Sequence, residues 1–201
     1  MLDQKTLQNY TALIFDMDGT LIDTMPSHAL AWEKVGKQLG YPISGQIMFD
    51  MGGAPVRKIA EEMCRRYAIP IQQLEEIIRL KRQFGLELVP KHATLLPAFD
   101  IVQQYQGKIP MALGTGSHAN MVNLLLNHFN LRSYFDIILT ADDVIHHKPH
   151  PETFLRCAEK LGVLPQQCLV FEDADFGVQA ALAANMDVFD VRINHIIYAT
   201  K

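Results

Sequence analysis

Two aspartates stand directly after a short apolar run near the start of the chain. The run Ala12-Leu13-Ile14-Phe15 predicts a strand buried on both faces, and Asp16-Met17-Asp18-Gly19-Thr20 follows it. Open α/β sheets bind ligands at the carboxyl ends of their strands. Two carboxylates about 4 Å apart repel each other by roughly 4 kcal/mol at an effective dielectric constant near 20. Mg²⁺ offsets such repulsion with oxygen ligands, although an isolated match of this kind is more often a solvated Asp-Gly turn.

Three further polar groups follow other apolar runs. Thr115, flanked by glycines, comes after the run 109–113, where its hydroxyl and the backbone N–H groups could bind an anion or cap a helix. Lys148 follows the run 136–139 and is held by the proline after it, although most lysines are simply solvated. Glu172 and Asp173 end the run 168–171. Buried strand ends rarely carry two acids without a cation, because unpaired burial is costly.

Together these residue types predict phosphoryl-transfer chemistry. Four strand ends would deliver carboxylates, a hydroxyl and an ammonium to one crevice of a parallel sheet. One carboxylate would serve as a nucleophile and another as a proton donor. The hydroxyl and the ammonium would bind the phosphate, and the remaining carboxylates would bind Mg²⁺.

The elements that must position these residues fall into two kinds. From Pro26 to about Pro90 apolar residues recur at helical spacing, and no strand-like run interrupts them. After Pro97 helices alternate with strands. The expected helices are 99–105, 121–126, 151–161 and 176–184, and the expected strands are 109–113, 136–139, 168–171 and 188–191.

Such alternation indicates right-handed βαβ units and a parallel sheet. We therefore predict an α/β fold in which a doubly wound, Rossmann-like parallel-sheet core carries an inserted helical cap. The core would comprise residues 1–23 and 91–201, and the cap would comprise residues 24–90.

The composition narrows the class of protein. The chain has 201 residues, 49% of them hydrophobic, and a net charge of −4, so we expect no nucleic-acid partner. No apolar stretch reaches membrane-spanning length and the polar start is not a secretory signal, so we expect a cytoplasmic monomer with no membrane partner. Cys64, Cys157 and Cys168 are widely spaced and are expected to be reduced packing residues.

On these residues the chain resembles the haloacid dehalogenase-like (HAD) superfamily of phosphatases. Its four signatures occur in the family's order, and the helical block resembles the family's type 1 cap. Within the superfamily the chain is similar to the β-phosphoglucomutase-like group. The runs 114–117, 146–149 and 171–177 resemble most closely the fructose-1-phosphatase branch of that group.

The resemblance implies roles for the acidic residues. Asp16 would attack phosphorus and become an aspartyl-phosphate. Asp18 would protonate the departing sugar oxygen and then take a proton from the hydrolytic water. Mg²⁺ would be bound by Asp16, by the backbone carbonyl of Asp18 and by Asp173, with Glu172 either as a nearby ligand or as a residue that supports the ligands. We expect Asp16 to face solvent at its strand end, so that its removal would leave the fold intact.

The resemblance also implies the residues that bind the substrate. Thr115, Gly116 and Lys148 would bind the phosphoryl oxygens, and Lys148 would also neutralise Asp16. Thr24 and His28 match positions at the cap hinge and near the proton-transferring aspartate. As a pattern alone, His28 is more typical of a histidine packed in the core, because it lies on an otherwise apolar helix face.

One departure from the group bears on the substrate. The mutases carry a cap lysine just before a glycine, and that lysine helps to bind a second phosphate, whereas this chain has Met51 before Gly52-Gly53. We therefore expect hydrolysis of a small sugar monophosphate, with fructose 1-phosphate as the first compound to test. A β-phosphoglucomutase-type isomerase is the alternative. Arg57 or Lys58 could reach the sugar, although solvated helix charges are the more common interpretation.

Other interpretations fit the sequence less well. A phosphorylation receiver domain also gathers acids, a threonine and a lysine at strand ends, but residues 24–90 have no place in one. A homologue that only bound sugar phosphates would have lost the nucleophile or an acid. The tract His146-His147-Lys148-Pro149-His150 could suggest a metal site, but two adjacent imidazoles do not easily bind one ion.

Overall fold

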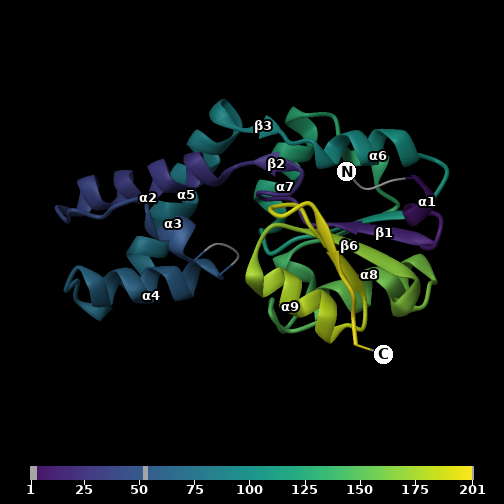
Figure 1. The fold of residues 1–201 in the computed structure, drawn as a ribbon. Coiled ribbons are helices and arrows are strands. Elements are labelled where there is room, and N and C mark those ends of the chain that lie inside the picture. The colour runs from purple at the N-terminus through teal and green to yellow at the C-terminus, as the bar shows by residue number, and fades with distance from the viewer. Residues whose placement is uncertain (1–3, 52–53, 201) are drawn as a thin grey trace. The chain divides into compact units, whose positions relative to one another are not determined.

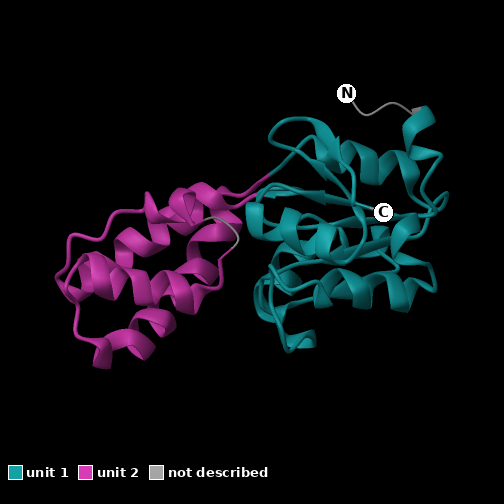
Figure 2. Ribbon diagram, turned by 60° about the horizontal axis from the view of Figure 1, so that its bottom comes forward, with its two compact units in different colours: residues 1–22, 95–201 teal, residues 23–94 magenta. Residues whose placement is uncertain are grey.

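The computed structural model describes residues 4–51 and 54–200 (Figure 1). The chain divides into two compact units, which Figure 2 colours separately. Unit 1 comprises Met1–Ile22 and Leu95–Lys201, and unit 2 comprises Asp23–Thr94. Unit 2 thus begins at Asp23 rather than at residue 24, and it ends at Thr94 rather than at residue 90.

A six-stranded sheet forms the centre of unit 1. Its strand order is β5-β4-β1-β6-β7-β8. The first five strands in this order pair in parallel, whereas β8 pairs antiparallel with β7. The strands are β1 (Ala12–Phe15), β4 (Met111–Gly114), β5 (Ile137–Leu139), β6 (Cys168–Glu172), β7 (Asp187–Asp190) and β8 (His195–Ile197). The chain winds from β1 to one side of the sheet and later to the other, which confirms the doubly wound α/β core.

Helices cover both faces of this sheet, as Figure 1 shows. The helices of unit 1 are α1 (Gln4–Leu7), α6 (Ala98–Tyr105), α7 (Ala119–His128), α8 (Glu152–Leu161) and α9 (Asp175–Ala183). Three 3₁₀ turns join them to strands, namely η2 (Arg132–Tyr134), η3 (Ala141–Asp143) and η4 (Pro165–Gln167). The side chains of α8 and α9 pack with Ile14 and Val170 in one buried cluster, while Phe15 stacks on Phe171 with ring centroids 4.5 Å apart. The central strands are therefore buried on both faces, which explains their continuous apolar runs.

Unit 2 is built from helices packed around a separate core. They are α2 (Met25–Leu39), α3 (Ile47–Asp50), α4 (Val56–Arg66), η1 (Ile71–Gln73) and α5 (Leu74–His92). Trp32 of α2, Met63 of α4 and Ile77 of α5 are fully buried in this core. Helix α2 ends at Gly40, whose φ of 79° is the left-handed conformation that favours glycine at a helix end. Helix α5 runs past Pro90 to His92, beyond its expected end.

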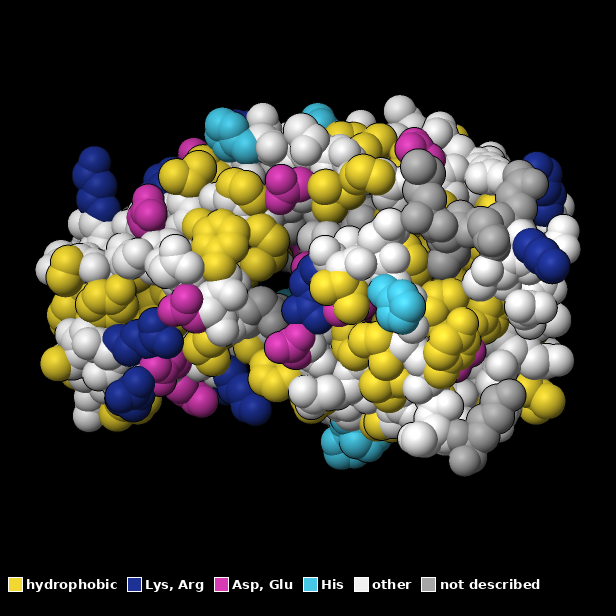
Figure 3. All heavy atoms as spheres, in the orientation of Figure 1, with side chains coloured by type: hydrophobic (Ala, Val, Ile, Leu, Met, Phe, Trp, Pro, Cys, Tyr) yellow, Lys and Arg dark blue, Asp and Glu magenta, His cyan; other side chains and the backbone are white. Residues whose placement is uncertain are grey.

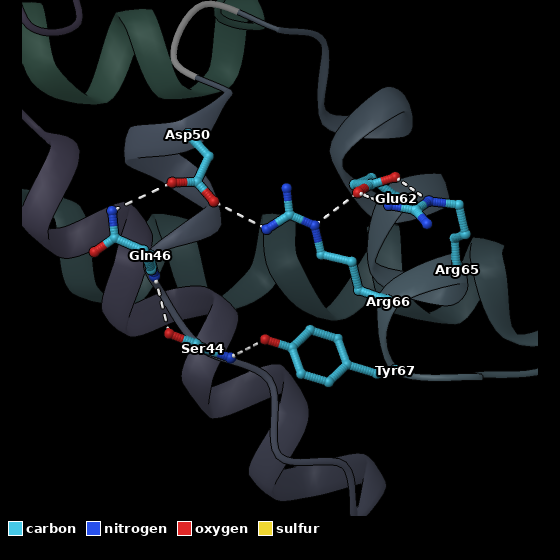
Figure 4. Close-up of polar contacts among 7 residues, drawn as sticks. All are labelled: Ser44, Gln46, Asp50, Glu62, Arg65, Arg66 and Tyr67. Atoms are coloured by element: carbon cyan, nitrogen blue, oxygen red, sulfur yellow. Dashed lines mark hydrogen bonds and ion pairs between the residues drawn. The ribbon is translucent and has the colours of Figure 1, made fainter.

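A network of charged side chains joins the short helix α3 to α4 on the surface of unit 2 (Figure 4). The Arg66 guanidinium donates to the carboxylates of Asp50 and Glu62, at 2.9 and 2.6 Å. Glu62 also accepts two hydrogen bonds from Arg65. In Figure 3, acidic and basic side chains accordingly lie side by side over the region where Figure 1 labels α4. The opposite charges offset one another, so this surface is not a cationic patch.

Two very short strands connect the units. β2 (Ile22–Asp23) pairs with β3 (Thr94–Leu95), and the Leu96 N–H donates to the Leu21 carbonyl oxygen at 2.9 Å. The boundary between the units falls inside both strands.

All three cysteines are free and buried, as expected of packing residues, and burial raises the pKa of Cys157 and Cys168 to about 12. No helix within the described residues is both long enough and apolar enough to cross a membrane.

Candidate active site

The carboxyl ends of three neighbouring strands bring the expected site residues together. β1 lies between β4 and β6, with Phe15 in register with Leu113 on one side and with Phe171 on the other. Asp16 follows β1, Thr115 follows β4, and Glu172 is the last residue of β6. Residues far apart in the sequence are therefore neighbours at one edge of the sheet, as the alternating pattern predicts.

Lys148 is the central cation of this edge. It comes from the loop between β5 and α8, and its Nζ donates to Asp16 Oδ1 and to Glu172 Oε1, both at 2.6 Å. The Phe154 ring lies under the same ammonium, 4.6 Å from Nζ to the ring centroid. Asp16 and Lys148 are only 6% and 7% exposed, so the expectation that Asp16 faces solvent is wrong. The carboxylate instead lies against the buried Lys148 ammonium.

Glu172 holds the lysine and the turn after β6. Its Oε1 accepts the hydrogen bond from Lys148, and its Oε2 accepts the backbone N–H groups of Asp173 and Ala174 at 2.9 and 3.0 Å. The carboxylate occupies the space beside Gly177 in α9. A Cβ atom there would lie 1.8 Å from Glu172 Oε1, so only glycine leaves room for it. Gly177 is a site-supporting residue that the sequence did not single out, because the collision depends on how α9 follows β6.

The second half of the Asp-Met-Asp-Gly-Thr motif supports Asp173. Thr20 Oγ1 donates to Asp173 Oδ1 at 3.0 Å. Gly19 has a φ of 86°, and a Cβ atom on it would lie 2.1 Å from Asp173 Oδ2. Gly19 is therefore required both for the turn and for the close approach of this carboxylate.

The loop after β4 contacts Asp18 through Ser117, a residue to which the sequence analysis assigned no role. Ser117 Oγ donates to Asp18 Oδ2 at 2.6 Å, and the Ser117 N–H donates to Thr115 Oγ1 at 3.0 Å. Thr115 is buried, and a Cβ atom on Gly116 would meet no atom within 4 Å, so this turn is open at Gly116. The serine two residues after Thr115 was the available sequence signal, but its pairing with Asp18 depends on the strand order.

The charges of this cluster are unbalanced. The site contains the carboxylates of Asp16, Asp18, Glu172 and Asp173 but only one ammonium, that of Lys148, which leaves a net charge of −3 when all are ionised. Burial, followed by the nearby Glu172, Asp173 and Asp18, raises the pKa of Asp16 well above its usual range, although Lys148 opposes this. Burial and then Glu172 raise the pKa of Asp173 to about 7. Burial would lower the pKa of Lys148, but Asp16 and Glu172 outweigh it and raise that pKa.

The same oxygens fit a hard divalent cation. Asp16, Glu172 and Asp173 each offer one carboxylate oxygen, and these three atoms lie within 4.8 Å of one another. Oδ1 of Asp16 and Oδ1 of Asp173 each accept one of the hydrogen bonds described above. Oxygen donors of this kind suit Mg²⁺, whose positive charge would offset the excess negative charge.

The remaining expected residues lie in unit 2. Thr24 precedes α2 and is fully buried, and His28 is buried on the first turns of α2. Lys81 Nζ lies 2.9 Å from His28 Nδ1 and 5.8 Å from the centroid of the Trp32 ring. Lys81 is itself buried, so unit 2 contains a buried lysine beside His28, which the sequence analysis did not identify.

The turn expected to contact the sugar is only partly described. Gly52 and Gly53 lie outside the described residues. Met51 caps the end of α3, and Arg57 pairs with Glu75 at 2.6 Å while both side chains remain exposed. Arg57 is thus a solvated helix charge, in line with the more common interpretation.

Comparison with known proteins agrees with this geometry. The profile of the haloacid dehalogenase-like hydrolases matches residues 13–191. Fructose-1-phosphate phosphatase YqaB of Escherichia coli K12 is 44% identical over 92% of this chain and 98% of its own. Hexitol phosphatase B of the same strain is 32% identical over 90% of this chain and 83% of its own. The crystal structure of a β-phosphoglucomutase from Clostridium difficile superimposes with a TM-score of 0.74 at 28% identity, covering 90% of this chain and 84% of that one.

Proposed function

The chain belongs to the haloacid dehalogenase-like hydrolase family, and on that premise we propose that it hydrolyses a small sugar monophosphate with Mg²⁺, through phosphorylation of Asp16. It is a phosphoric monoester hydrolase. The observation that carries the proposal is the buried Lys148, 2.6 Å from Asp16 and from Glu172 beside a set of oxygens that suits a divalent cation.

Asp16 and Asp173 would hold Mg²⁺, together with the backbone carbonyl oxygen of Asp18, while Glu172 holds Lys148. The bound cation would neutralise the carboxylates and the phosphoryl charge, which favours approach of one anion to another. Lys148 and the turn at Thr115 would bind the phosphoryl oxygens, since an ammonium and backbone N–H groups are both donors to phosphate.

The reaction would proceed in two displacements. An Asp16 carboxylate oxygen attacks phosphorus, the bond from phosphorus to the sugar oxygen breaks, and Asp18 transfers its proton to that oxygen. Water then attacks the phosphorus of the aspartyl-phosphate, Asp18 takes the proton of the water, and inorganic phosphate leaves with Asp16 restored. Ser117 donates to Asp18 Oδ2 at 2.6 Å, so it would fix the orientation of that carboxyl group through both steps.

The substrate class rests on the relatives and on unit 2. One relative is a fructose-1-phosphate phosphatase and another is a hexitol phosphatase, so we propose fructose 1-phosphate as the first substrate to test. We also propose that the helical unit is the cap that selects the sugar, with Thr24 and His28 among its contributing residues. The internal Lys81 would set the orientation of His28.

A mutase reaction is the second candidate, favoured by the likeness to a β-phosphoglucomutase structure. Hydrolysis is preferred because Met51 stands where the mutases have a phosphate-binding lysine. A mutase must hold a bisphosphate intermediate, which requires a second phosphate site.

The test is a panel of hexose, pentose and polyol phosphates, assayed for phosphate release with and without Mg²⁺. Release should require Mg²⁺, should favour a hexose monophosphate and should be lost in Asp16→Asn, which keeps the shape of the side chain. Faster formation of glucose 6-phosphate from β-glucose 1-phosphate than phosphate release from any panel member would establish the mutase. Met51→Lys gives a second measurement, since restoring the lysine should strengthen binding of glucose 1,6-bisphosphate.

A further inference from the structure

The loop that carries Lys148 also brings two histidine rings together. The rings of His146 and His150 have centroids 4.6 Å apart and are tilted by 45°. Both side chains are exposed, and Lys148 lies between them in the sequence. Two imidazoles on adjacent residues do not easily bind one ion. In the folded loop the neighbouring rings are four residues apart, and His147 is not one of them.

The backbone on both sides of the pair is fixed. Glu152, the first residue of α8, accepts the N–H groups of Ile145 and His146 at 3.0 and 2.9 Å. The His150 N–H donates to the His147 carbonyl oxygen at 3.0 Å. These hydrogen bonds position the two rings at one place on the surface.

The ring nitrogens suit a transition-metal ion. His150 Nδ1 accepts a long hydrogen bond of 3.3 Å from the Glu152 N–H, so in the neutral ring this nitrogen carries the lone pair. A metal ion could replace that weak donor without removing a proton. Two imidazoles on one tetrahedral ion keep their ligating nitrogens about 3.3 Å apart, so the two exposed rings must turn from their present packing, and the segment that carries them must shift, to bind one ion.

We propose that His146 and His150 form a surface site for a late first-row divalent cation such as Cu²⁺ or Zn²⁺, and that occupancy slows catalysis by displacing Lys148. Among the described residues, only Asp16, Glu172 and Asp173 form a group of three or more potential ligands, so water would complete the coordination at the histidines. Imidazole favours these ions over Mg²⁺, and Cu²⁺ binds most tightly in the first-row series. The site is therefore distinct in chemistry from the carboxylate cluster.

The coupling to Lys148 follows from geometry. Its ammonium lies 2.6 Å from Asp16, and Lys148 is only two residues from each ligating histidine. Drawing both rings onto one ion moves the short backbone segment between them. Because a misplacement of about 1 Å can reduce catalysis by up to about 10²-fold, we expect roughly tenfold inhibition at saturation.

Binding is tested on the whole chain with Mg²⁺ at saturating concentration, so that the carboxylates are occupied. Cu²⁺ is added, and electron paramagnetic resonance is recorded for wild type, His146→Gln, His150→Gln and the matched control His147→Gln. The wild type and the control should show splitting from two nitrogen ligands, and the other two variants should lose it. Identical spectra in all four proteins would overturn the proposal.

The inhibition rests on the proposed phosphatase activity and is measured separately. With p-nitrophenyl phosphate and saturating Mg²⁺, micromolar Zn²⁺ should slow the wild type and His147→Gln about tenfold and leave His146→Gln and His150→Gln unaffected. Equal inhibition of all four proteins would overturn the link to Lys148. Absence of Mg²⁺-dependent turnover in the wild type would instead overturn the proposed function, while the spectra would still decide the metal site.

Discussion

At the scale of single residues, the carboxylates of the site differ in the groups that donate hydrogen bonds to them. Asp16 and Glu172 share the ammonium of Lys148, Asp173 accepts from Thr20, and Asp18 accepts from Ser117. Asp16 and Glu172 thus have a charged donor in common, whereas Asp173 and Asp18 each accept from a different hydroxyl group. Different donors allow chemically identical groups to act as nucleophile, metal ligand and proton carrier.

The proposed proton carrier can be tested through the leaving group. Asp18→Asn should lower kcat for fructose 1-phosphate by about 10²- to 10⁴-fold, because an amide cannot protonate the departing sugar oxygen. p-Nitrophenolate leaves without a proton, so the same variant should still release a first-turnover burst from p-nitrophenyl phosphate. Rapid-mix kinetics measure both. Ser117→Ala should show the same preference more weakly, and an equal loss on both substrates would contradict this role of Asp18.

The raised pKa of Asp173 predicts a pH dependence of Mg²⁺ binding. Its ordinary pKa of 3.8 rises to about 7 in the folded chain, so the folded state binds more protons than the unfolded state between these values. The stabilising contribution of this carboxyl is full below pH 3.8 and is lost as the pH rises through about 7. Mg²⁺ competes with that proton. We expect about tenfold weaker Mg²⁺ binding at pH 6 than at pH 8.

Thermal unfolding at several Mg²⁺ concentrations measures this dependence. The increase in Tm caused by Mg²⁺ should be larger at pH 8 than at pH 6. Asp173→Asn serves as the control and should show little increase at either pH. Equal Mg²⁺ affinities at the two pH values would show that proton binding to Asp173 does not compete with the ion.

At the scale of elements, the ends of strands and the beginnings of helices determine the site. Glu172 ends β6, and Gly177 lies in the first turns of α9, where the backbone passes next to the Glu172 carboxylate. Gly177→Ala should force this carboxylate away from Lys148. We expect a stability loss of about 1–3 kcal/mol from overpacking and a decrease in kcat of about tenfold or more.

A double-mutant cycle tests the cause of that loss. If the collision with Glu172 is responsible, Gly177→Ala should cost much less stability in a Glu172→Ala background. Gln179→Ala, at an exposed position of the same helix, controls for the general effect of alanine in α9. Additive stability changes would place the cause elsewhere.

The elements also show what a sequence can predict. β1 and β6 were predicted because strands buried on both faces must be apolar throughout. β8 was missed because it is a short edge strand with exposed and buried positions, and β2 and β3 have two residues each, too few for a periodic signal. The antiparallel pairing of β8 therefore corrects the expectation that β7 is the last strand of a purely parallel sheet.

The site, too, has some features that the sequence could predict and others that it could not. Its Asp, Thr, Lys and Glu residues could be placed because parallel strands present their carboxyl ends at one edge, whatever the side-chain details. Three other features could not be predicted. They are the hydrogen bond from Ser117 to Asp18, the close approach of Gly177 to Glu172, and Lys81 beside His28. Each is a contact between elements whose relative placement only the folded chain defines.

At the scale of the whole molecule, two hydrophobic cores stand in two units. Trp32 is the single tryptophan of the chain and is fully buried in unit 2, whereas the proposed Mg²⁺ ligands belong to unit 1. Mg²⁺ should therefore raise the unfolding midpoint that circular dichroism assigns to unit 1 and leave the midpoint of Trp32 fluorescence unchanged. Parallel urea titrations measure both midpoints. A single midpoint that moves with Mg²⁺ in both signals would show that the units unfold as one.

The pairing of β2 with β3 affects how easily the helical unit could be exchanged during evolution. The chain leaves the sheet-containing unit and returns to it through neighbouring strands, which lie about 4.8 Å apart in any sheet. An insertion whose two ends nearly meet imposes almost no strain on the protein that receives it. The helical unit can therefore be exchanged for another of different size, or for a few residues of turn, without altering the catalytic sheet. If the helical unit selects the sugar, as we propose, substrate choice could then change in evolution independently of the proposed catalytic residues.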